Sequence, residues 1–285
     1  MPELPEVETI RTGLEPYLTG SGICDVEILY PKVLKDAEPE EVRKRICGQK
    51  GVSLKRRGKY LIWELSSGDR LVFHLRMTGQ LVLTDPQEDI RKHTSFIIRL
   101  DAGLELRLTD TRKFAFMYLW KKERESPPGS LGELGPEPLE EGFTPVYLRG
   151  LCTDSKTRIK NLLLDQAKIA GIGNIYADES LFRAGINPRT PAGELSAADL
   201  ERLHRTIREI LREAIAYRGT TKRDYLDGFG AAGAFQERLL VYGRKGEKCV
   251  RCGRDIVRSV LGSRGTYYCP VCQREKAPKK NKGRE

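Results

Sequence analysis

The chain has 285 residues, which is enough for two domains with their own hydrophobic cores. Its 50 Lys and Arg residues against 40 Asp and Glu residues give a net charge of +10 and a pI near 9.2, which suits a polyanionic partner, most simply a nucleic acid. No apolar run approaches the roughly 20 residues of a membrane span, and the acidic, proline-rich start is unlike a signal peptide. We therefore expect neither a membrane-spanning nor a secreted protein.

The first residues combine a chemical signal with a helical one. Removal of Met1 would make Pro2 the amino terminus, and a secondary amine with a pKa of about 8 could attack an electrophilic carbon. Glu3 and Glu6 place carboxylates beside it, Pro5 suits the first turn of a helix, and apolar residues follow at helical spacing. From these residues alone, an ordinary terminus that leads into a helix is the preferred interpretation, and the rest of the chain changes this balance.

Residues 24 to 120 favour β-structure. Between Leu104 and Thr109, leucines alternate with polar residues that include Glu105 and Arg107, which predicts one buried and one solvated face. We expect a β-sandwich flanked by the first helix and by a second helix near 39–47. Segments rich in β-branched, aromatic and leucine residues predict the strands, at 24–30, 52–65, 70–84, 95–100, 104–109 and 114–120.

A Pro- and Gly-rich stretch at 125–145 indicates a linker, and the periodicity after it is helical. One helix is predicted from the apolar spacing between Ile159 and Ala167, and the glycines at 171 and 173 interrupt it. Asn174 is expected to cap the next helix, which ends at Gly185. Two helices joined by a tight glycine turn resemble DNA-binding helix-turn-helix units.

A longer helix is predicted to start at Ser196, with Asp199 in a capping-box position, and to end near Gly219. The segment 219–235 is rich in glycine and alanine between charged residues. We expect a mobile loop there.

Four cysteines near the carboxyl end have the spacing of a zinc site. Cys249-x2-Cys252 and Cys269-x2-Cys272 are separated by sixteen residues, and four thiolates at this spacing satisfy tetrahedral zinc. So small a segment has little core without the metal. The other three cysteines follow no pattern, which indicates a reducing compartment; they are Cys24, Cys47 and Cys152. The tail after Gln273 is basic, and we expect it to be disordered.

Specific motifs occur together along the chain, and over residues 2 to 273 they resemble one family. The chain is similar to the bacterial formamidopyrimidine-DNA glycosylases, which are 8-oxoguanine DNA glycosylases and AP lyases. Leu4 is typical of this branch, whereas the sister endonuclease VIII branch usually has glycine there. The motifs are MPELPEVET at 1–9, RGKYL at 57–61, HLRMTG at 74–79, DTRKF at 110–114, GIGNIY at 171–176 and RGTYYC at 264–269.

The resemblance implies a set of catalytic residues. Pro2 would attack C1′ of the sugar of a flipped-out nucleotide, and Glu3 would shuttle protons during base release. Lys59 lies among other basic residues and could belong to a solvated, phosphate-facing stripe, but the resemblance favours a specific role as proton donor and phosphate ligand in the elimination. Arg264 would assist the later elimination, alone or together with phosphate anchoring. The resemblance implies one structural Zn²⁺ and no catalytic metal or organic cofactor.

The resemblance also implies DNA contacts. Met77, Arg112 and Phe114 would fill the gap left by the flipped base, and Arg112 would bond the orphaned partner base. Here Thr111 and Ala115 stand where the family usually has proline and glycine. Further contacts to phosphates are expected from His74, His93, Asn174 and, by a weak correspondence, Lys156.

The expected fold is α+β. Its domains are an N-terminal catalytic β-sandwich at 1–130, a linker at 131–148, a helical helix-two-turns-helix domain at 149–236, a zinc finger at 237–273 and a basic tail at 274–285. The expected partner is duplex DNA with oxidised purines or abasic sites, bound by a cytoplasmic bacterial monomer. Two alternatives stay open: an oxidised-pyrimidine glycosylase of the endonuclease VIII branch, and a zinc-finger DNA-binding protein without catalysis.

Overall fold

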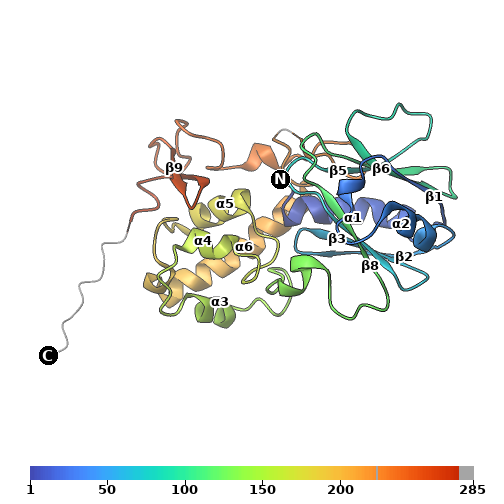
Figure 1. Ribbon diagram of the computed structural model, residues 1–285. Helices are drawn as coiled ribbons and strands as arrows, with labels where there is room; N and C mark the ends of the chain where they lie inside the picture. Colours follow the sequence, from blue (N-terminus) through green and yellow to red (C-terminus); the bar gives the residue numbers. More distant parts are fainter. Residues whose placement is uncertain (223, 276–285) are drawn as a thin grey trace. The chain divides into compact units, whose positions relative to one another are not determined.

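The computed structural model describes residues 1–222 and 224–275 (Figure 1). The chain forms two compact units. The first contains Met1–Leu134 and Ala214–Glu237, and the second contains Gly135–Glu213 and the chain from Arg238 on. The chain therefore enters the first unit a second time after most of the second unit is complete.

The first unit is built on two four-stranded antiparallel sheets, which confirms the predicted sandwich. Their strand orders are β1-β6-β7-β5 and β2-β3-β4-β8. Two predicted segments each contain two strands, because turns interrupt 52–65 at Gly58 and Lys59, and 70–84 after His74. The strands are β1 Ile23–Ile28, β2 Gly51–Arg57, β3 Tyr60–Leu65, β4 Arg70–His74, β5 Gln80–Thr84, β6 Thr94–Leu100, β7 Glu105–Thr109 and β8 Phe116–Trp120.

Helix α1 (Leu4–Leu18) packs against β2 and β3, and α2 (Pro39–Ile46) packs against β1 (Figure 1). The apolar stripe of α1, from Val7 through Leu14 to Leu18, is buried in the main core with Trp63 of β3. The helix approaches the sheet so closely that a Cβ at Gly51 would lie 2.0 Å from the carbonyl oxygen of Leu18. Only glycine fits there, and this contact fixes α1 on the sheet.

The predicted solvated face of β7 is wrong for two residues. Glu105 and Arg107 are both buried, and their carboxylate and guanidinium lie 2.7 Å apart. The connection between β5 and β6 covers this face, since the Arg107 guanidinium donates to the carbonyls of Glu88 at 2.9 Å and Asp89 at 3.2 Å. A buried pair that binds backbone oxygens satisfies its charges, so polar residues can occupy the inside position.

The second unit is helical and ends in a hairpin. Its helices are α3 (Pro145–Cys152), α4 (Ile159–Leu164) and α5 (Asn174–Ala184), and α6 (Ala197–Ala216) begins in it. Strands β9 (Val257–Leu261) and β10 (Arg264–Tyr268) pair antiparallel.

The helix ends test the predicted signals. The capping box before α6 is confirmed, because Ser196 and Asp199 exchange side-chain and backbone hydrogen bonds at 3.1 and 3.2 Å. Gly185 ends α5 in the left-handed region, as predicted. Two details are wrong: α4 ends before Ala167, and Gly173 rather than Asn174 is the N-cap residue of α5.

None of the seven cysteines, all of which lie among the described residues, forms a disulfide. Over the same residues, no helix has both the length and the apolar character needed to cross a membrane. Among its described residues, which exclude Arg223, the segment 219–235 has no helix or strand apart from the start of a 3₁₀ turn at Phe235–Arg238. The predicted tail lies outside the described residues from 276 on.

Candidate active site and zinc hairpin

The start of α1 is buried and held by one carboxylate. Pro2 and Glu3 are both buried, and Glu3 is 2% exposed. The Glu6 carboxylate accepts the backbone N–H of Glu3 at 2.8 Å through Oε2, and the N–H of Thr220 at 2.7 Å through Oε1. Glu6 therefore fixes the backbone that carries Pro2 and Glu3, and it ties this backbone to the segment after α6.

Tyr225 joins the same arrangement, and nothing in the sequence marked it. Its hydroxyl donates to the carbonyl of Arg218 at 3.2 Å and reaches that of Glu6 at 3.4 Å. Burial raises the pKa of the Tyr225 hydroxyl, and the nearby Glu6 charge raises it further. The phenol stays neutral and keeps its role as a donor.

Lys59 lies in the turn between β2 and β3 and is 7% exposed. A salt bridge at 2.8 Å joins the neighbouring Arg56 to Glu8 of α1. The end of β2 next to Lys59 is thereby attached to α1, which follows Pro2 and Glu3. Lys59 is buried whereas Lys55 on β2 is exposed, so the basic residues of this region do not form a uniformly solvated stripe.

His74 ends β4 in an aromatic setting. Its ring lies 4.6 Å from the Tyr60 ring and stacks on Phe116 at 5.2 Å, and Nδ1 accepts the N–H of Arg76 at 3.0 Å. Burial, together with the charges of Arg76 and Lys59, lowers the pKa of His74 from 6.5 to about 3. The imidazole is neutral at physiological pH, with its proton on Nε2, so it can offer DNA a neutral donor and no charge.

The predicted void-filling residues lie in two connections of the first unit. Met77 follows β4 and is 40% exposed, while Phe114, before β8, is 51% exposed. The Arg112 guanidinium lies 4.8 Å from the centre of the Phe114 ring. Large apolar side chains held at the surface are available to a partner, whereas core residues are not. His93 is half-buried at the end of the β5–β6 connection, with a φ of 71°.

Arg264 opens β10 in the second unit and is exposed. Helices α4 and α5 hold this strand, because the Asn174 amide donates to the Gly265 carbonyl at 2.9 Å and the Lys160 ammonium donates to the Thr266 hydroxyl at 2.9 Å. Asn174 is the first residue of α5, one position after the N-cap residue Gly173. The Asn174 side chain positions the hairpin that carries Arg264.

The sequence did not mark Lys160, which forms a fully buried ion pair with Asp178 at 2.7 Å. Asp178 also accepts the N–H of Tyr267 at 2.9 Å. Burial raises the pKa of Asp178, although the Lys160 charge opposes the change. Lys156, the residue predicted here, is exposed in the connection between α3 and α4.

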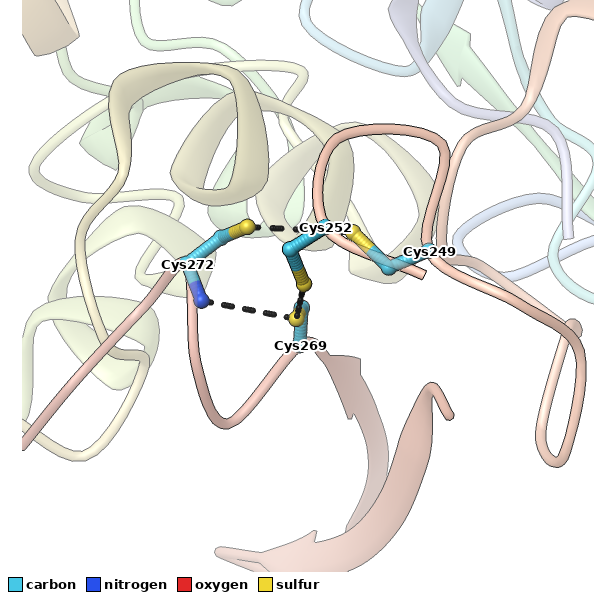
Figure 2. Close-up of side chains that lie close together, drawn as sticks. All are labelled: Cys249, Cys252, Cys269 and Cys272. Atoms are coloured by element: carbon cyan, nitrogen blue, oxygen red, sulfur yellow. Dashed lines mark hydrogen bonds between the residues drawn. The ribbon is translucent and has the colours of Figure 1, made fainter. Parts of the chain in front are cut away.

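The four predicted cysteines converge at the base of the hairpin (Figure 2). Their sulfurs all lie within 4.8 Å of one another, with Cys249 3.8 Å from Cys272 and Cys252 3.5 Å from Cys269. Tetrahedral zinc with Zn–S bonds of about 2.3 Å separates its sulfurs by about 3.8 Å. Four thiolates this close together repel one another, and a bound Zn²⁺ offsets that repulsion.

Backbone contacts support the cluster. The N–H of Cys272 donates to the Cys269 sulfur at 3.4 Å (Figure 2). Buried Gln273 accepts the N–H of Cys269 at 2.9 Å and donates to the Ile186 carbonyl at 2.8 Å. The cysteines form a structural zinc site that is bound to the helical part of the same unit.

Comparison with known proteins covers almost the whole chain. Three family models match: "Formamidopyrimidine-DNA glycosylase N-terminal domain" at residues 1–117, "Formamidopyrimidine-DNA glycosylase H2TH domain" at 134–225 and "Zinc finger found in FPG and IleRS" at 246–274. The formamidopyrimidine-DNA glycosylases of Geobacillus kaustophilus and Pelotomaculum thermopropionicum are each 47% identical, over 96% and 97% of this chain and 100% of their own.

Solved structures agree with this result. A complex of Lactococcus lactis Fpg (MutM) with DNA that contains N7-benzyl-Fapy-dG has a TM-score of 0.90, and a complex of MutM with DNA that contains carbocyclic 8-oxo-G has one of 0.89. Each is 38% identical to this chain and covers 96% of it and 100% of its own length. On sequence, fold and zinc hairpin together, the chain belongs to the formamidopyrimidine-DNA glycosylase family.

Proposed function

We propose that this chain removes oxidised purines, namely 8-oxoguanine and formamidopyrimidines, from duplex DNA with Pro2 as nucleophile, and then cuts the abasic strand. The observation that carries the proposal is the buried start of α1, where Glu6 holds the backbone of Glu3 at 2.8 Å and Pro2 precedes it. A helix start favours negative charge, and a rigidly held amine meets its target without reordering. The family and its DNA complexes support the same activity.

The chemistry follows from a free Pro2 amine. Its nitrogen forms a bond to C1′ while the glycosidic bond breaks, and the base leaves with the electron pair and a proton delivered through Glu3. Opening of the sugar gives an iminium, which acidifies the 2′ hydrogens. Loss of one of them expels the 3′ phosphate, and a second elimination expels the 5′ phosphate. We assign proton donation and phosphate binding in these steps to Lys59 and Arg264.

Base release requires that the damaged nucleotide leave the stack, at a cost of a few kcal/mol. We assign the filling of the resulting gap to Met77, Arg112 and Phe114, whose exposure supports this role. Arg112 is then the contact to the orphaned base. Phosphate contacts are assigned to the other predicted residues, namely His74, His93, Lys156 and Asn174.

The domain limits, the oligomeric state and the cellular location are part of the same proposal. We assign a sandwich at 1–130, a linker at 131–148, a helical domain at 149–236, a zinc finger at 237–273 and a basic tail at 274–285. The proposed catalytic residues fall in the sandwich and in the zinc finger, and the last part of the helical range, from Ala214, belongs to the first compact unit. A net charge of +10 supports DNA as the partner of a monomer in the bacterial cytoplasm.

The test is borohydride reduction of the iminium on a duplex with 8-oxoguanine. Mass spectrometry first verifies that Met1 has been removed. The processed wild-type protein should form a stable covalent adduct with DNA, and Pro2→Gly should form far less. Pro31→Gly, at an exposed proline of the same unit, is the matched control and should behave as wild type. A folded, processed protein that releases 8-oxoguanine and never forms the adduct would contradict the assigned role of Pro2.

A second substrate class has one specific observation in its favour. A Lactococcus lactis Fpg complex contains DNA with an oxidised pyrimidine, at a TM-score of 0.89 to this chain. Leu4 favours the purine branch. Release of 8-oxoguanine should therefore exceed release of thymine glycol under the same conditions, and the reverse order would assign the chain to oxidised pyrimidines. Tight binding of abasic DNA without strand cleavage would instead favour a non-catalytic DNA-binding protein.

A further inference from the structure

Asp110 is a buried carboxylate with no part in the chemistry proposed above. It follows β7 directly and is 1% exposed. Its Oδ1 accepts the N–H of Arg112 at 3.0 Å and the hydroxyl of Thr78, while its Oδ2 accepts the N–H groups of Phe114 at 2.7 Å and Ala115 at 2.6 Å. A carboxylate with this many donors fixes each of them, because charge-assisted hydrogen bonds are the stronger kind.

These bonds join the loops that carry the proposed DNA contacts. Thr78 follows Met77 in the β4–β5 connection, and two of the three amides belong to Arg112 and Phe114 themselves. The backbone N–H of Asp110 also donates to the carbonyl of His93 at 3.1 Å. One residue therefore connects three separate stretches of chain, at 75–79, 91–94 and 110–115.

The backbone at each of these places is in an uncommon conformation. Arg76, His93 and Lys113 have φ values of 53°, 71° and 56°. Residues with a Cβ adopt positive φ only where surrounding contacts fix them, and such residues gather at functional sites. Thr111 has no proline ring to fix φ in the loop that carries Arg112. Hydrogen bonds from the amides of Arg112, Phe114 and Ala115 to Asp110 hold this loop.

Close packing reinforces this arrangement. A Cβ on Gly79 would lie 2.5 Å from the Leu75 carbonyl oxygen and 2.8 Å from the Ala115 methyl group. The loop with Met77 and the loop with Phe114 therefore touch beside the carboxylate. A displacement of either loop would disturb both.

We propose that Asp110 is a positioning residue, whose carboxylate holds Met77, Arg112 and Phe114 in one preorganised arrangement for filling the gap left by a flipped nucleotide. The inference rests on the proposed function. The Asp110 carboxylate bonds these loops before DNA binds. The loops therefore do not have to become ordered when their side chains enter the duplex. Its consequence is selective: steps that need a duplex to be opened depend on Asp110, and steps on a strand without a partner do not.

The test compares two substrates with the variant Asp110→Asn. In either orientation the new amide nitrogen faces a backbone N–H, so at least one loop loses its bond. Excision of 8-oxoguanine opposite cytosine in a duplex should fall at least tenfold under single-turnover conditions. Borohydride trapping on a single-stranded abasic oligonucleotide should stay within twofold of wild type. Preference for cytosine over adenine opposite the lesion should also decrease, because Arg112 is no longer fixed.

The matched control is Asp101→Asn, which changes an exposed aspartate in the β6–β7 turn and should leave both assays within twofold of wild type. Thr78→Val removes one donor and leaves the carboxylate and its three backbone bonds in place. It should reduce duplex excision by about two- to fivefold with single-strand trapping unchanged, and it decides the question if Asp110→Asn does not fold.

Two results would overturn the role of Asp110. One is a folded Asp110→Asn protein that excises from duplex DNA within twofold of wild type. The other is an equal loss on duplex and single-stranded substrates, which would indicate general damage to the fold. Failure of the proposed function looks different, because the wild-type protein itself would then release no 8-oxoguanine, or Phe114→Ala would excise normally. Either of those results would also remove the basis for the inference.

Discussion

Replacement of His74 by asparagine should weaken the acid sensitivity of the first unit. Asparagine Oδ1 can occupy the place of Nδ1 and accept the Arg76 N–H, but it does not titrate. The native pKa of His74 is lowered from 6.5 to about 3 by burial and by the charges of Arg76 and Lys59. Below pH 6.5 the unfolded chain therefore binds a proton at this position that the native protein does not. Stability is lost as the pH falls from about 6.5 toward about 3.

The magnitude follows from these two pKa values. Protonation stabilises the unfolded state by about 0.2 kcal/mol at pH 7 and by about 2 kcal/mol at pH 5. Other titrating groups also make the free energy of unfolding depend on pH. Their contributions are the same in the wild-type protein and in His74→Asn, so they cancel when the two proteins are compared. Between pH 7 and pH 5, the wild-type protein should lose about 2 kcal/mol more of its free energy of unfolding than His74→Asn does.

Tryptophan emission during urea unfolding is the assay. The chain has two tryptophans, Trp63 and Trp120, and both lie in the first unit, so their emission follows that unit. Leu71→Ala on the same strand is the control: it should lower stability at both pH values and keep the wild-type difference between them. Equal losses for wild type and His74→Asn would show that His74 titrates alike in the folded and unfolded states, which would refute the account of its environment.

Three further perturbations test the remaining features. Zinc removal by a chelator, verified by metal analysis, should abolish DNA binding and leave tryptophan emission unchanged; full binding by the metal-free protein would contradict the structural role of zinc. DNA affinity should fall by roughly 10³-fold between 50 and 200 mM salt if about six phosphates are contacted, as measured by fluorescence anisotropy, and a flat profile would exclude a basic binding surface. Lys160→Met should cost about 3 kcal/mol in urea unfolding because Asp178 is left buried without its cation, and Lys160→Met combined with Asp178→Leu should cost less; a single variant as stable as wild type would contradict the buried pair.

Local signals in the sequence predicted those parts of the protein that depend on near neighbours. The cysteine spacing predicted the zinc cluster, and the Ser196–Asp199 pair predicted the start of α6, because each is complete within a short segment. The exposure of Met77 and Phe114 confirms that they are not core residues, although their contact with DNA stays a prediction. Glycine breaks and apolar spacing were sufficient for the strands, apart from the turns within two segments.

Contacts between distant segments were not predicted. Arg107 is buried because the β5–β6 connection folds over its face of the sheet, and alternation along a strand contains no information about such a cover. Asn174 had the residue type of a cap, but it is the first helical residue of α5, and its amide nitrogen donates to the hairpin strand β10. In the sequence, Asp110 has the type and place of an ordinary turn residue. Its hydrogen bonds to the stretches at 75–79 and 91–94 exist only because the fold brings those stretches close to it. Each of these cases requires the tertiary fold, which spacing along the chain does not encode.

The return of residues 214–237 to the first unit bears on how the protein is made. When the ribosome has released Leu134, Glu6 still lacks the Thr220 amide, and the Leu83 amide lacks the Gly228 carbonyl that it meets at 2.8 Å. The first unit, which begins with Pro2, can reach its final state only after helices α3 to α6 have been synthesised. A nascent chain therefore completes the hydrogen bonds that hold the start of α1 only after the helical part of the second unit has left the ribosome.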